Sequence, residues 1–111
     1  MKIATVKINQ DTWEVRMVEP DKKKMNPNEE NVYLGLTEYQ KGVINLRKGL
    51  SKSMIRSTVI HELTHAFIYS YGYQIDGEEV MCNFWGAQGD AILHMANEIM
   101  KKVDVCCQRK K

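Results

Sequence analysis

The hydrophobic pattern of this chain changes its period once, near residue 50, and that change constrains the fold more than any other feature. Before it, residues 2–9 and 12–18 alternate apolar and polar side chains, as half-buried β-strands do. From about Ser51 onward, apolar residues recur at intervals of three and four, which is typical of amphipathic helices. A sheet followed by helices indicates the α+β class.

The turn residues between these segments predict the order of the strands. The strands at 2–9 and 12–18 are close enough in sequence to form a hairpin. Residues 19–31 hold both prolines and show no periodicity, so we expect a loop there. Further strands are expected at 32–37 and 42–46. The sequence therefore predicts an N-terminal antiparallel sheet of three to four strands.

Two helices are expected after the sheet. The first runs from about Ser51 to Tyr71, with Ser51 or Ser53 as N-cap and Gly72 just past its end.

The second helix runs from about Asp76 to Val103. Gly86 and Gly89 interrupt its apolar stripe and predict either a kink or a close helix contact.

Composition excludes several classes of protein. The 111 residues suit a single domain spanning 1–111, and the net charge of +2 does not predict nucleic acid as a partner. No apolar run approaches the roughly 20 residues that span a bilayer, and the N-terminus lacks the apolar core of a signal peptide. We therefore expect a cytoplasmic protein. The three cysteines are odd in number and two are adjacent, so no disulfide framework is expected. They form no Cys-x-x-Cys pair, so a thiolate zinc site is not expected.

Residues 61–65, His-Glu-Leu-Thr-His, are the segment that carries chemistry. On a helix, residues four apart lie on the same face, so His61 and His65 can bind one metal ion. Glu62 lies roughly 100° further around the helix axis, where it can reach a water molecule beside the metal. This His-Glu-x-x-His pattern is typical of zinc hydrolases in which the glutamate is the general base.

A catalytic zinc needs a third protein ligand and one open position. Glu79 is the best candidate, because it follows the second histidine by fourteen residues and begins the next helix, which would return beside the first. Asn83 lies on the same helical face as Glu79 and could hold a ligand imidazole in orientation. Glu79 also fits a capping box with Asp76, and His94 is an alternative third ligand.

The segments "STVIHELTHAFIYSYG" and "DGEEVMCNF" resemble the small ImmA/IrrE-type zinc metallopeptidases, including short members carried by phages and mobile elements. Glu79 and Asn83 match the ends of that family's Glu-x-x-Ala-Asn pattern, with Cys82 in place of the alanine. The resemblance implies a small zincin-like, gluzincin-like domain that uses Zn²⁺. The residues that match the family's metal motif outright are His61, Glu62 and His65.

The sequence therefore predicts zinc-dependent hydrolysis of peptide bonds in an intracellular protein substrate. Zinc would activate a water molecule, and Glu62 would take its proton. The substrate would add to a sheet edge, for which residues 42–46 are the expected strand. The alternative function is a non-catalytic zinc-containing module that binds a regulatory protein partner. The candidates for a second oxyanion donor are Tyr69, Tyr71, Tyr73 and His94.

Overall fold

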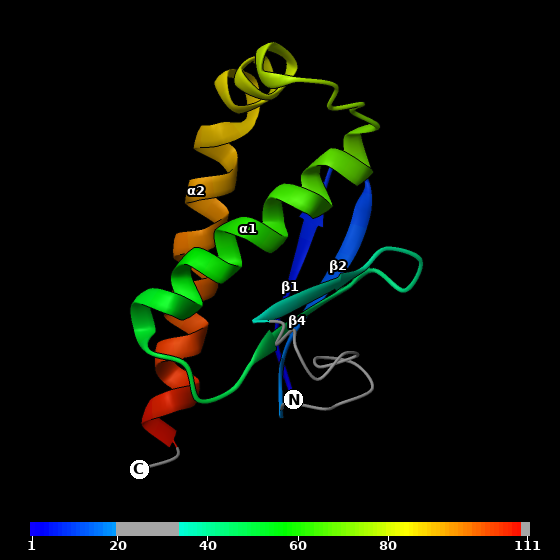
Figure 1. Cartoon of the computed structure of the whole chain (residues 1–111). Coiled ribbons are helices and arrows are strands. Elements are labelled where there is room, and N and C mark those ends of the chain that lie inside the picture. Colours follow the sequence, from blue (N-terminus) through cyan, green and yellow to red (C-terminus); the bar gives the residue numbers. More distant parts are fainter. Residues whose placement is uncertain (20–33, 110–111) are drawn as a thin grey trace, which may run out of the picture.

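The computed structural model describes residues 1–19 and 34–109, with side chains described up to residue 104. Figure 1 shows a four-stranded sheet followed by two helices, which confirms the expected α+β order. Most of the expected loop at 19–31 and the first residues of the third expected strand lie outside the described residues. The elements in chain order are β1 (Lys2–Ile8), β2 (Asp11–Val18), β3 (Gly35–Glu38), β4 (Val43–Arg47), α1 (Lys52–Tyr71) and α2 (Glu78–Arg109).

The sheet is mixed, with the strand order β1-β2-β4-β3. β1 pairs antiparallel with β2, and β3 pairs antiparallel with β4, but β2 and β4 run parallel. The expectation of a wholly antiparallel sheet is therefore wrong. The parallel pairing of β4 has a physical cause in its burial: four successive residues, Val43, Ile44, Asn45 and Leu46, are all buried. A strand that is buried on both faces takes a central position, which leaves β1 and β3 at the two edges of the sheet formed by the described residues.

One hydrophobic core lies between the sheet and the two helices. Alternate residues of β2 and β4 supply the sheet side of this core, and α1 and α2 supply the other side. The Nε1 of buried Trp13 donates a hydrogen bond to Ser70 Oγ at 2.9 Å, which ties β2 to the end of α1. The largest fully buried side chains include Trp13, Phe84, Ile44, Leu63 and Ile92.

Helix α1 has the two ends that its sequence predicts. Ser51 is extended at φ −62° and ψ 158°, and its side chain accepts a hydrogen bond from the Met54 N–H at 3.3 Å. Gly72 adopts φ 71°, and its N–H bonds the carbonyls of Ile68 and Tyr69. These caps fix the register of the helix and therefore the positions of residues 61–65.

Helix α2 starts at Glu78 and continues to Arg109, past the expected end at Val103. The helix continues through Gly86 and Gly89 without a break. A Cβ added to Gly89 would lie 2.8 Å from Cε3 of Trp85, so this glycine makes room for a ring of its own helix. No helix among the described residues is long and apolar enough to cross a membrane.

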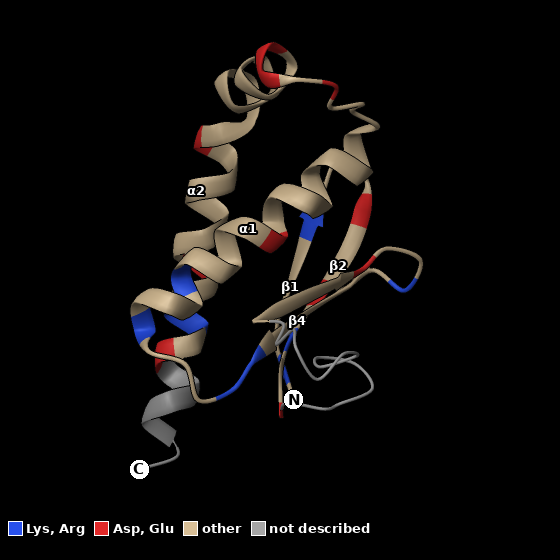
Figure 2. Cartoon of the chain, in the orientation of Figure 1, with Lys and Arg blue, Asp and Glu red and all other residues tan. Residues whose placement is uncertain are grey.

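The two helices contact one another at the end where α1 begins. Lys52 Nζ lies 3.3 Å from Asp104 Oδ2, and Arg56 Nη2 lies 3.3 Å from Asn97 Oδ1. Figure 1 shows that α1 and α2 separate toward the connection that joins them. In Figure 2, acidic residues are coloured near the start of α2 and basic residues near the start of α1. The start of α2 is thus not packed along α1 as a closely antiparallel hairpin would be.

Candidate metal centre

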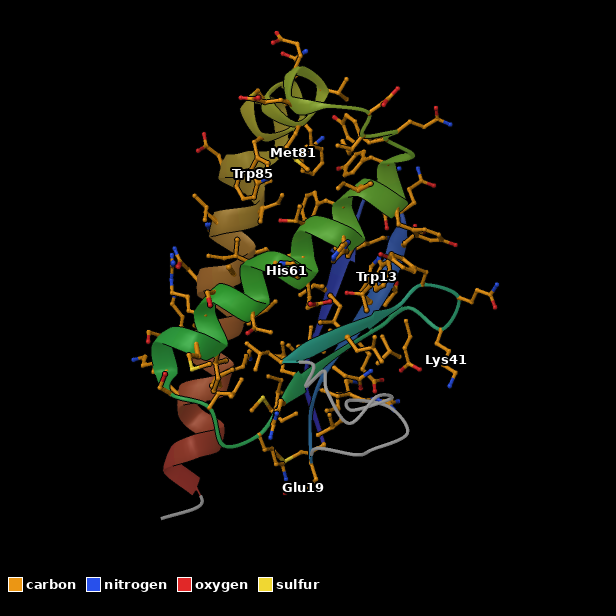
Figure 3. All side chains as sticks on the ribbon, viewed as in Figure 1. Trp13, Glu19, Lys41, His61, Met81 and Trp85 are labelled. Carbon is orange, nitrogen blue, oxygen red and sulfur yellow. The ribbon has the colours of Figure 1, made fainter. Side chains whose placement is uncertain are left out.

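His61 and His65 form a pair of imidazoles on the exposed side of α1, and Figure 3 labels His61 near the middle of that helix. Their Nε2 atoms lie 3.2 Å apart, and their ring centroids lie 4.9 Å apart. Two nitrogen ligands at about 2.0–2.1 Å from one tetrahedral ion lie about 3.3 Å from each other. The two nitrogens therefore already have the separation that two ligands of a single zinc ion need.

Glu62 lies beside this pair but points into the fold. Its side chain is buried, with only 6% of the residue exposed. Thr37 Oγ1 of β3 donates a hydrogen bond to Glu62 Oε1 at 2.6 Å. The other carboxylate oxygen, Oε2, lies 3.8 Å from His61 Nε2. One oxygen is thus held by the sheet, and the other lies on the side of the imidazoles.

Gly35 allows β3 to approach α1 closely enough for this hydrogen bond. A Cβ at position 35 would lie 2.7 Å from Thr58 Cγ2 and 2.9 Å from Glu62 Cγ. Contacts this short do not occur between real carbon atoms, so any larger residue would push the strand and the helix apart. Gly35 and Thr37 are two residues apart on one strand and share the face that meets α1.

Tyr39 lies two residues after Thr37, in the turn that follows β3, and it also contacts α1. Its ring centroid lies 6.5 Å from that of His65 in an edge arrangement and 5.0 Å from that of Tyr69. Partial burial, and then the negative charge of Glu62, raise the pKa of Tyr39 above its ordinary value. The hydroxyl therefore stays protonated and can donate a hydrogen bond.

A surface depression of about 580 Å³ opens next to Tyr39. It lies over the turn between β3 and β4 and adjoins the imidazole pair through the Tyr39 ring. A site for an extended chain needs such a space beside its reactive groups. The residues that line it are Thr37, Glu38, Tyr39, Gln40, Lys41 and Tyr69.

Glu79 is exposed in the first turn of α2, and the structure does not bring it to the histidines. Across residues 1–19 and 34–109, no three His, Cys, Asp or Glu side chains gather closely enough to hold a metal ion. Figure 3 shows Met81, two residues after Glu79, well apart from His61. As the third ligand, Glu79 stays a prediction.

The divergence of the two helices accounts for this separation. Arg56 contacts Asn97 near the start of α1, and from there the helices move apart toward the connection that joins them (Figure 1). A third ligand from Glu79 therefore requires the start of α2 to move toward α1.

The remaining residues predicted from the sequence lie exposed on α2 or pack against other aromatic side chains. Asn83 and His94 are exposed on α2, and the charge of His94 acts on Glu98 of the same helix. Tyr71 stacks on Phe67 with centroids 5.9 Å apart.

Tyr73 packs edge-on against Phe84 and accepts a hydrogen bond from Gln88 through its hydroxyl at 3.2 Å. Among the predicted oxyanion donors, Tyr69 is the one that lines the depression.

Two residues of the site were not predicted from the sequence, Thr37 and Tyr39. Both act through partners on α1 that lie more than twenty residues away in the chain. The signal available was their spacing: Gly35 and Thr37 alternate along β3 and face one way, and Tyr39 follows two residues later in the turn after the strand.

No protein-family model matches this chain, and neither a curated protein nor a solved structure matches it. The resemblance to the ImmA/IrrE-type peptidases rests on the motif residues and their spacing.

Proposed function

We propose that this protein is a zinc-dependent peptidase with a zincin-like domain, acting on a cytoplasmic protein or peptide. The observation that carries the proposal is the 3.2 Å separation of the Nε2 atoms of His61 and His65, with Glu62 beside them. A structural zinc site activates no water molecule and so needs no general base. A hydrolytic site needs a carboxylate such as that of Glu62 as its base.

In this mechanism, His61 and His65 hold the zinc ion, with Glu79 as the predicted third ligand. When bound, zinc would make a water molecule more acidic and would polarise the substrate carbonyl. Glu62 accepts a proton as the water oxygen bonds to the carbonyl carbon. It then passes that proton to the nitrogen when the carbon–nitrogen bond breaks, which yields a carboxylic acid and an amine.

Thr37 prepares Glu62 for this proton transfer. Its hydrogen bond occupies Glu62 Oε1 and so directs Oε2 toward the side where His61 lies. Because both side chains are buried, the carboxylate has one preferred orientation before substrate arrives.

The substrate is proposed to bind along β3. The sequence favoured residues 42–46 as the docking edge, but β4 pairs with strands on both sides. β3 is the edge strand on the side of α1 that holds Glu62. An extended peptide can add to such an edge through main-chain hydrogen bonds, which favours unstructured segments as substrates.

The test compares zinc-loaded wild-type protein with Glu62→Gln on a diverse peptide library, with cleavage read by mass spectrometry. The variant is expected to keep zinc and to lose about 10²-fold to 10⁴-fold of the cleavage rate. Glu98→Gln is the matched control, because Glu98 is exposed on α2 and pairs with Lys101. Cleavage by Glu62→Gln at the wild-type rate contradicts the mechanism. Zinc binding without any cleavage by the wild type favours the protein-binding role.

A further inference from the structure

Tyr39 is the aromatic residue of the depression that also touches the imidazole pair. It ends the run Gly35, Thr37, Tyr39 that faces α1, and its ring meets His65 edge-on with centroids 6.5 Å apart. Thr37, two residues before Tyr39, holds the Glu62 carboxylate by its hydrogen bond. Tyr39 therefore contacts the metal-binding pair and lies close in the chain to the residue that orients the proposed base.

Two further aromatic side chains, Tyr69 and Trp13, support the position of the Tyr39 ring. Tyr39 packs on Tyr69, and Tyr69 packs edge-on against Trp13 with centroids 6.1 Å apart. Trp13 is 1% exposed and is itself held by its hydrogen bond to Ser70. A donor held in this way loses little conformational freedom when it engages a substrate.

We propose that the Tyr39 hydroxyl donates a hydrogen bond to the oxygen of the scissile carbonyl as that oxygen gains negative charge. This inference rests on the proposed function. The hydrogen bond strengthens as the carbonyl carbon becomes tetrahedral, so it stabilises the transition state more than the bound substrate. Tyr71 and Tyr73, two donors predicted from the sequence, pack instead against Phe67 and Phe84.

The test uses the full chain loaded with Co²⁺, whose visible spectrum reports both metal binding and anion binding. Methylphosphonate serves as a tetrahedral oxyanion that resembles the reacting centre, and thiocyanate serves as a linear anion. Tyr39→Phe is expected to bind methylphosphonate about tenfold to a hundredfold more weakly than wild type, because one hydrogen bond to a charged oxygen is lost. The affinities of the same variant for Co²⁺ and thiocyanate are expected to stay unchanged.

Tyr71→Phe is the matched control, because Tyr71 stacks on Phe67 and is not among the residues that line the depression, and it should bind methylphosphonate as wild type does. If Tyr39→Phe and wild type bind methylphosphonate equally, or if wild type binds Co²⁺ but no methylphosphonate, the assignment of Tyr39 fails alone. A wild-type protein that gives no Co²⁺ spectrum overturns the proposed function, and this inference falls with it.

Discussion

Glu62 is a charged residue that the fold largely removes from water. A buried carboxylate destabilises a fold unless hydrogen bonds replace its hydration. Here the replacement comes from Thr37, whose hydroxyl lies 2.6 Å from Glu62 Oε1. At the scale of the residue, Glu62 and Thr37 are therefore coupled, and substituting one should change what the other contributes to stability.

Thr37→Val tests this coupling. Valine keeps a similar shape but cannot donate, so Glu62 Oε1 would lose a buried hydrogen bond. We expect the free energy of unfolding to fall by about 1–3 kcal/mol, measured by urea denaturation. Thr37→Ser retains the hydroxyl and should lose less. Equal stability of the valine variant and wild type would show that the hydrogen bond contributes nothing.

Gly35→Ala tests the close approach of β3 to α1. The added methyl would meet Thr58 Cγ2 at 2.7 Å and Glu62 Cγ at 2.9 Å. We expect a loss of about 1–3 kcal/mol in unfolding free energy, as for other overpacked sites.

Gly86→Ala is the matched control for this substitution, because a Cβ there meets nothing within 4 Å. Since Gly86 lies within α2, alanine should stabilise the protein by about 0.5–1 kcal/mol. Thermal denaturation of the two variants should therefore shift the midpoint in opposite directions, and a shift of the same sign in both contradicts the packing account.

At the scale of the element, local signals predicted what is local. Ser51 and Gly72 predicted the ends of α1, and the alternation at 2–9 and 12–18 predicted the β1–β2 hairpin. The order of the strands was not predictable in this way, because β4 is inserted between β2 and β3 by burial on both faces. The same holds for Thr37, whose partner Glu62 lies 25 residues away.

The N-cap of α1 is one such local signal with a measurable effect. Ser51→Ala removes the oxygen that accepts from the Met54 N–H, so we expect a loss of about 1 kcal/mol in unfolding free energy. Ser53→Ala is the control, because among the described residues the Ser53 hydroxyl hydrogen-bonds only that of Ser51, at 3.4 Å. If both variants lose the same amount in denaturant titrations, Ser51 does not act as the cap.

At the scale of the whole molecule, the two helices decide whether the metal centre can be completed. The contacts of Lys52 and Arg56 hold α2 against the start of α1, whereas the start of α2 lies apart from the histidines. Of the three proposed ligands, the described part of the chain therefore brings together only His61 and His65. A third ligand from Glu79 would couple metal binding to a closer packing of the helices, so binding should be measurable as added stability.

Zinc is therefore expected to raise the thermal midpoint of the wild type and not that of His61→Ala. A ligand that binds only the folded protein adds about 2.7 kcal/mol at a hundred times its Kd. Metal binding needs deprotonated imidazoles, so the gain should shrink as the pH is lowered. An equal gain in His61→Ala would place the zinc elsewhere.

Glu79→Gln and Glu78→Gln then separate a ligand from a helix-terminal charge. Both residues lie in the first turn of α2, where an acidic side chain interacts favourably with the helix dipole, so both variants lose that same small effect without metal. If Glu79 is the third ligand, only Glu79→Gln should also weaken zinc binding, measured by competition with a coloured chelator. Equal zinc affinities in the two variants would show that Glu79 is not the third ligand. Zinc binding would then not require the start of α2 to move toward α1.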